Sequence, residues 1–424
     1  MTNTTSTPPD SNEPLVLASS LETARNFREY FQNWVTRIKA GDTGALPVIC
    51  GLIILAIIFQ SLNGNYLTAG NLVNLMVQGA VYMLFAQGMI FVLLLGEIDL
   101  SIGFIGGVAG VVTAELIFGD HGYPWYIGIA AGLLTGAALG LFNGIVITMI
   151  GLPSFIVTLA GLLAYNGLML IILGNGGTVP INDDMVNNLA NAVLSPLTGW
   201  IVTIVVVAIY LADMLLKERR RRAKGNAGLP SSIVALKVIG VLVAGLAVIL
   251  ICNANRGRIV AIEGMPWVLL IVLGFAALWN ILLSRTAFGT YVYAIGGNAE
   301  AARRAGISVT RIRIIVFTIA GFMGGVAGLI YASRLRSVST NLDGGTLVLY
   351  CIAAAVIGGT SLFGGRGKAV HAILGGLVIA SIDNGMGLLG LSAAARYVVT
   401  GVVLVIAVTL DAVASRGRAS SGLG

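Results

Sequence analysis

Apolar and polar positions alternate along this chain in long blocks, and not with the short period of a soluble domain. Apolar stretches of about 20 residues, the length that crosses a bilayer as a helix, recur between residues 45 and 413. The pattern predicts an all-α polytopic membrane bundle of about 10 to 12 transmembrane helices, and leaves open whether one or two shorter stretches are re-entrant or broken. About twelve stretches are recognisable, near 45–62, 71–95, 102–119, 125–150, 154–174, 198–216, 232–253, 265–283, 312–332, 346–363, 369–382 and 391–413.

Composition supports this class. Of 424 residues, 57% are hydrophobic and 10% charged, whereas a soluble domain carries about 25% charged residues. The net charge of +7 comes from basic residues in short loops between apolar stretches, so it indicates membrane topology and no nucleic-acid partner. The densest basic run begins the loop 217–231, which we place in the cytoplasm. The loop 285–311 then lies on the same side, as do both termini.

Three regions follow from these boundaries. Residues 1–44 are polar and lack an apolar run followed by a small-residue cleavage site, so they are expected to form an N-terminal cytoplasmic tail. Residues 45–413 form the transmembrane domain. Residues 414–424 are expected to form a C-terminal cytoplasmic tail.

Glycine is frequent, at 57 residues, and five glycines fall on every fourth position between Gly128 and Gly144. Helices in lipid gain little from hydrophobicity, so small residues that let backbones touch supply packing energy. A four-residue step advances about 40° beyond one turn, so this helix is expected to contact several neighbours.

A short polar helix is predicted within Asn298–Ile307, between long apolar segments. Its signals are an N-cap, an acidic first turn, a basic last turn and a C-terminal glycine. So short a helix is marginal in water and needs a surface to dock on. It is either a handle for a protein outside the membrane or an ordinary helix in a surface loop. The signals are carried by Asn298, Glu300, Arg303, Arg304 and Gly306, with Ala301 and Ala302 allowing close approach.

Signatures of catalysis are missing from the sequence. There are two histidines, and the three cysteines lack metal or redox spacing. The run 364–369 resembles a phosphate-binding loop, but Leu362 replaces its first glycine and Ala369 replaces the Ser or Thr that would hold magnesium. We therefore expect no catalytic residue, metal or cofactor in this chain. Any nucleotide energy must come from another subunit.

Polar groups near apolar stretches are candidates for a gate or pathway. Glu97, Asp99 and Ser101 lie in the motif GEIDLSIG, where helix capping by Asp99 or Ser101 is the alternative interpretation. Asn166 lies inside a predicted span, where it could bind a hydroxyl-rich substrate or tie helices together. Asn384, with Asp383, falls between the last two spans, in what reads as a solvated turn. So few buried carboxylates disfavour a proton- or sodium-coupled mechanism.

Five motifs in order resemble the sugar permeases of ATP-binding-cassette (ABC) importers, in the ribose/xylose permease family, and most closely its xylose-type branch. They are GEIDLSIG at 96–103, LPSFIVTLAG at 152–161, AIGGNAEAARRAGI at 294–307, VIGGTSLFGGRG at 356–367 and IDNGMGLLG at 382–390. The resemblance implies a fold like that of type II ABC importers. It also implies import of a monosaccharide, a xylose-like pentose above all, across the inner membrane of a bacterium.

The resemblance further implies partners. These are a second copy of the chain, a separate ATPase that carries ATP and magnesium, an extracytoplasmic sugar-binding protein and the surrounding lipid. Residues Asn298, Glu300, Ala301, Ala302, Arg303, Arg304, Gly306 and Ile307 match the segment that couples to the ATPase. Glu97 departs from the family pattern, since many relatives have glycine there. The alternative function is a stand-alone secondary transporter.

Overall fold

The computed structural model describes residues 29, 32, 46–119, 122–223, 229–257, 259–340 and 344–420. Most of the predicted N-terminal tail, residues 224–228 of the basic loop and the end of the predicted C-terminal tail lie outside the described residues. The described residues divide into a hairpin unit, formed mainly by 196–223, 229–253 and 412–420, and a main unit, formed by 46–195 and 254–411.

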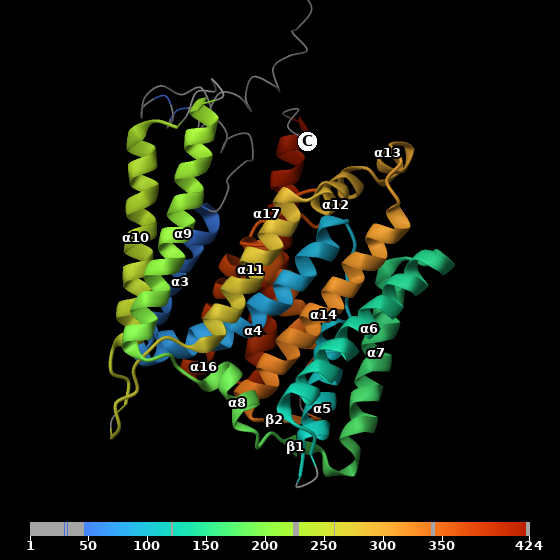
Figure 1. Ribbon diagram of the computed structural model, residues 1–424, viewed down its shortest axis with the longest axis horizontal. Helices are drawn as coiled ribbons and strands as arrows, with labels where there is room; N and C mark the ends of the chain where they lie inside the picture. The colour runs from blue at the N-terminus through green and yellow to red at the C-terminus, as the bar shows by residue number, and fades with distance from the viewer. Residues whose placement is uncertain are drawn as a thin grey trace, which may run out of the picture. The chain divides into compact units, whose positions relative to one another are not determined.

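Every predicted apolar stretch coincides with a helix (Figure 1). Eight helices among the described residues are long and apolar enough to cross a membrane, and four more have shorter apolar stretches, so the all-α polytopic prediction is confirmed. The twelve are α3 (Leu46–Leu62), α4 (Ala69–Leu94), α5 (Ile102–Ile117), α6 (Trp125–Ile150), α7 (Ser154–Leu173), α9 (Pro196–Ala223), α10 (Ser231–Asn253), α11 (Trp267–Arg285), α14 (Val309–Leu335), α15 (Gly344–Ile357), α16 (His371–Leu388) and α17 (Ala393–Ser420).

The remaining elements are short. The 3₁₀ turn η1 (Gly174–Gly176) leads into β1 (Thr178–Pro180), which pairs antiparallel with β2 (Ser337–Ser339). Helix α8 (Asp184–Asn191) follows β1, and Asp183 caps it by accepting a hydrogen bond from Val186 N at 3.0 Å. Helices α12 (Ala287–Gly297) and α13 (Ala299–Arg304) precede α14.

The hairpin unit consists mainly of α9 and α10, whose apolar stretches are only 6% and 11% buried. Helix α9 runs to Ala223, so the prediction of a loop starting at residue 217 was wrong. The helix persists because acidic residues one turn earlier pair with the basic ones: Lys217 with Asp213 at 2.6 Å, and Arg222 with Glu218 at 3.0 Å.

Helices α4 and α14 form the centre of the main unit. Their apolar stretches are 89% and 67% buried, the two highest fractions among the eight long spans, and α16 follows at 61%. Helix α4 packs on α15 and α16, whereas α14 packs on α5 and α6. Because α4 ends where α14 begins (Figure 1), the two central helices run antiparallel. Each central helix thus packs on two helices that lie far from it in the sequence.

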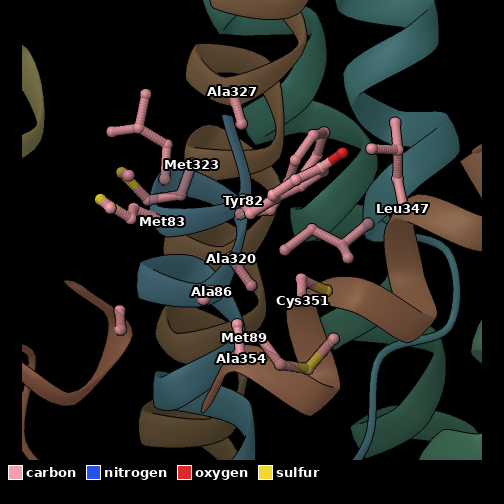
Figure 2. Packing of buried hydrophobic residues seen from close by; sticks show 14 of the residues in the cluster. Tyr82, Met83, Ala86, Met89, Ala320, Met323, Ala327, Leu347, Cys351 and Ala354 are labelled. Carbon is pink, nitrogen blue, oxygen red and sulfur yellow. The ribbon is translucent and has the colours of Figure 1, made fainter. Parts of the chain in front are cut away.

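The contact between the central helices uses small and flexible side chains. Figure 2 shows alanines and methionines of α4 and α14 facing each other, with α15 completing the cluster. Met side chains fill irregular gaps and Ala allows close approach, so these helices pack closely. The labelled residues are Tyr82, Met83, Ala86, Met89, Ala320, Met323, Ala327, Leu347, Cys351 and Ala354.

The five regularly spaced glycines of α6 are all buried. A Cβ added at Gly132 would overlap Thr113 Oγ1 of α5, and one at Gly140 would lie 2.9 Å from Gly321 Cα of α14. The helix thus turns its glycine stripe from α5 to α14 along its length. This confirms the prediction that the stripe contacts more than one neighbour.

Replacing Gly140 with Ala should destabilise the protein by about 1–3 kcal/mol, because the added methyl group would be forced against the α14 backbone. The measurement is the melting temperature of the detergent-solubilised protein. Gly167→Ala is the matched control, since no atom lies within 4 Å of a Cβ added at this helical position in α7. Equal melting temperatures for the two variants would contradict the close α6–α14 contact.

Candidate functional site: the junction beside α13

The short polar helix predicted from the sequence is α13. Asn298 Oδ1 accepts a hydrogen bond from Ala301 N at 2.9 Å, and Gly306 has φ +84°, so both predicted ends are confirmed. Ala302 is buried and Ile307 half-buried, and these two residues dock the segment. The remaining side of α13 is exposed.

The charged side chains of α13 are held in place by one another. Glu300 pairs with Arg303 at 2.7 Å and with Arg304 at 3.2 Å, while the two arginine side chains stay 66% and 80% exposed. These exposed pairs contribute little to stability. They orient the two guanidinium groups on a short helix whose other side chains are mostly alanine.

Helix α12 was not predicted from the sequence, because its residues were assigned to the loop 285–311. Thr286 ends α11 and caps α12, accepting a hydrogen bond from Gly289 N at 3.3 Å. The predicted loop 285–311 therefore contains two helices, α12 and α13, before α14 begins.

The end of α4, the end of α12 and the loop before α16 meet, mostly through backbone atoms. Gly365 N donates to Leu94 O at 2.9 Å, and Tyr293 OH donates to Gly367 O at 2.7 Å. A Cβ added at Gly296 would overlap Leu94 O and lie 2.5 Å from Gly365 N. We call this meeting of residues 94–97, 293–297 and 363–367 the junction. It joins three of the sequence motifs, which the sequence could not place together.

An ion pair ties the junction to α14. Glu97 Oε1 lies 2.5 Å from Arg313 Nε, and the two side chains are 10% and 31% exposed. Burial raises the pKa of the Glu97 carboxyl, and the neighbouring guanidinium opposes that rise. Glu97 therefore links the GEIDLSIG loop to the first turns of the helix that follows α13.

Asp99 starts a buried polar network that reaches two further helices. Its Oδ1 accepts hydrogen bonds from Ser101 N at 2.8 Å and Ser101 Oγ at 2.6 Å. Ser101 Oγ accepts from Asn143 Nδ2 at 2.9 Å, and Tyr165 OH donates to Asn143 Oδ1 at 2.7 Å. Asp99 thus fits the capping interpretation, whereas the Ser101 side chain makes no capping hydrogen bond to α5.

The other two gate candidates lie apart from this network. Asn166 is half-buried on α7 and forms no hydrogen bond with the part of the chain that the structure describes. Asn384 exchanges side-chain hydrogen bonds with Asn71 of α4, at 2.8 and 3.0 Å. The structure therefore brings together Glu97, Asp99 and Ser101, and separates them from the other candidates.

The prediction of a turn at Asp383 and Asn384 was wrong, since both lie inside α16. Gly385 suggested a turn, but it is a packing position, where a Cβ would lie 2.5 Å from the ring of Phe59. Asn384 is 7% exposed, so neither an open loop nor solvent surrounds it.

Residues 71–408 match the protein family described as branched-chain amino acid transport system/permease component. The chain belongs to this permease family. The match includes the whole junction, α13 and the Asp99 network. It confirms the family expected from the motifs.

Three relatives illustrate the similarity. The permease is 37% identical to the xylose transport system permease protein XylH of Escherichia coli K12, over 89% of this chain and 94% of the relative. It is 36% identical to XylH of Haemophilus influenzae, over 86% and 95%. It is 34% identical to the ribose import permease protein RbsC of Bacillus subtilis, over 85% and 90%. No solved structure matches it.

Gly296→Ala should disrupt the junction, because the new methyl group would have to displace the Leu94 carbonyl. We expect a lower melting temperature and faster protease cleavage between α12 and α14. Gly297→Ala is the matched control, since nothing lies within 4 Å of a Cβ at that position. The close backbone contact is refuted if the two variants melt and digest alike.

Glu97 and Arg313 should be energetically coupled. Glu97→Gln and Arg313→Gln should each lower the melting temperature, and the double variant should lose less than their sum, with a coupling of about 1–3 kcal/mol. The exposed pair Asp213 and Lys217 is the control cycle, where coupling should stay below about 0.5 kcal/mol. Additive losses at 97 and 313 would argue against a functional ion pair.

Proposed function

We propose that this permease is the membrane subunit of a bacterial ABC importer that carries a monosaccharide into the cytoplasm. The names of the relatives support a sugar, and the greater identity to xylose permeases than to the ribose permease favours a xylose-like pentose. The similarity extends along at least 85% of the chain for each of these relatives, so it includes the helices as well as the motifs.

We infer that α13 is the docking site for a separate ATPase, which would bind the ATP and magnesium. The observation that carries this proposal is the position of α13 beside the junction. Its exposed arginines are pre-oriented by Glu300, and its preceding helix touches both α4 and the loop before α16 through glycine backbones. A displacement of α13 would therefore reach the centre of the bundle with little side-chain adjustment to absorb it.

Alternating access follows from this coupling. Closure of the ATPase would move α12 and α13, and tightly packed helices shift as rigid bodies because packed cores have discrete arrangements. The path would then open to the opposite side. We propose that a second copy of the chain completes the path and that an extracytoplasmic binding protein delivers the sugar at the end opposite α13.

The proposed orientation places α13, the junction and both termini in the cytoplasm, with the protein in the inner membrane. Arg285, Arg313, Arg366 and Lys368 all lie near the junction end of the main unit, in agreement with the preference for positive charge on the cytoplasmic side. The opposite end carries the β1–β2 pair and α8.

The double variant Arg303→Glu/Arg304→Glu should abolish ATP-driven xylose uptake, because it reverses the charge of the proposed docking helix. Uptake is measured in proteoliposomes that contain the permease, its ATPase and the loaded binding protein. Insertion should be unchanged, since both side chains are exposed.

The matched control is Arg219→Glu/Arg220→Glu, an equal charge reversal at exposed positions of α9. It should retain uptake. Normal uptake by the Arg303/Arg304 variant would contradict docking at α13. Xylose accumulation by the permease alone, driven by an ion gradient, would replace the proposal with a secondary transporter.

A further inference from the structure

A second polar cluster lies at the opposite end of the main unit from the junction. It gathers side chains from α4, α15, α16 and the first turns of α17. Asp383 is at its centre: Oδ2 accepts hydrogen bonds from Gln78 Nε2 and, at 2.7 Å, from Tyr82 OH. The cluster consists of Gln78, Tyr82, Tyr350, Asp383, Arg396 and Thr400, and we call it the Asp383 cluster.

Aromatic rings form one wall of the cluster. The rings of Tyr82 and Tyr350 meet edge to face with their centres 5.2 Å apart. Thr400 Oγ1 donates to Tyr350 OH at 3.4 Å, which connects α17 to the same wall. Tyrosines in this arrangement offer both an apolar surface and hydroxyl groups.

The ionic pair of the cluster is loose. Asp383 Oδ1 lies 4.0 Å from Arg396 Nη1, which is beyond hydrogen-bonding distance. The Asp99 network differs in this respect, because Asp99 Oδ1 is fully engaged by Ser101 at 2.6–2.8 Å. Carboxylate and guanidinium groups within a membrane domain are costly, and a loose pair recovers little of that cost.

The Asp383 cluster is open on one side. The Arg396 side chain is 36% exposed and that of Asp383 is 13% exposed. Gly387 is exposed next to them, and a Cβ added there would meet only the Arg396 guanidinium, at 3.8 Å. The carboxylate and the guanidinium are therefore partly accessible at the surface of the main unit.

The depth of the cluster follows from the helix positions. Asp383 precedes the end of α16 at Leu388 by five residues, which is about 8 Å along the helix. Asn71, near the start of α4, pairs with Asn384 at the same level, whereas Leu94 at the other end of α4 lies in the junction. If the junction is cytoplasmic, as the proposed function requires, the cluster lies in the outer half of the membrane domain.

We propose that the Asp383 cluster binds the hydroxyl groups of the transported sugar as it enters the path. A carboxylate accepts hydrogen bonds from hydroxyls and a guanidinium donates to them, so two groups 4 Å apart suit neighbouring hydroxyls of one sugar. The buried Tyr82 and Tyr350 rings would support the site from behind and would not contact the sugar. Gln78 and Tyr82 hold the Asp383 carboxylate in position.

Asp383→Asn should lower the amount of xylose imported per ATP hydrolysed by about tenfold, the effect of losing roughly one charge-assisted hydrogen bond. ATP hydrolysis stimulated by the loaded binding protein should continue, which a folding defect would not allow. Tyr82→Phe should give a smaller loss. Tyr126→Phe is the matched control, because it removes an exposed phenol of α6 that belongs to neither polar network, and it should leave the ratio unchanged.

A labelling experiment tests the site without altering Asp383. Gly387→Cys, in a chain whose Cys50, Cys252 and Cys351 are replaced by Ser, should react with a water-soluble maleimide, and xylose with the loaded binding protein should slow the reaction. Gly167→Cys on α7 is the control and should show no effect of sugar.

The outcomes separate the two proposals. If the unchanged permease imports no xylose with its ATPase and binding protein, the proposed function fails. If import is normal but Asp383→Asn keeps its ratio, or the cysteine at 387 is unreactive, the sugar site is refuted. Disulfide formation between two copies through that cysteine, with no protection by sugar, would assign this face to a dimer contact and also refute it.

Discussion

Close approach of helix backbones is the constraint on which the structure of this permease depends. Lipid is as apolar as the side chains that face it, so helices associate through backbone contact and polar bonds more than through burial. A Cβ at Gly328 would overlap Gly106 O, and one at Gly375 would overlap Ala354 O, so both halves of the bundle use this contact. The junction at Gly296 uses it as well. The end that we assign to coupling is therefore built like the bundle that it would move.

The two polar networks differ in their hydrogen bonding and exposure. The Asp99 network joins α5, α6 and α7 by short hydrogen bonds, and Asp99 itself is fully buried, although its Oδ2 has no hydrogen-bond partner among the described residues. The Asp383 cluster joins α4, α15, α16 and α17 around a loose ion pair with a partly exposed guanidinium. The two networks therefore differ in how accessible their charged groups are.

Local sequence patterns predicted the positions of the helices well. They did not predict which residues far apart in the sequence come into contact. Apolar length located twelve helices, and the caps at Asn298 and Gly306 located α13, because these signals act within one or two turns. Gly385 was misread as part of a turn, since glycine serves both as a turn residue and as a packing position in lipid. Only the position of Phe59, far away in the chain, decides between these uses.

Ion pairs between distant residues were equally hard to predict from the local sequence. Arg313 belongs to the basic residues that indicate the cytoplasmic side, and nothing near it in the sequence distinguishes it from the others. In the fold it is the partner of Glu97. A carboxylate buried at this loop needs a cation within reach, and a basic residue required for topology supplies one at no further cost in buried charge. Residues 97 and 313 therefore have to be interpreted together, since either charge alone would be left unpaired at the junction.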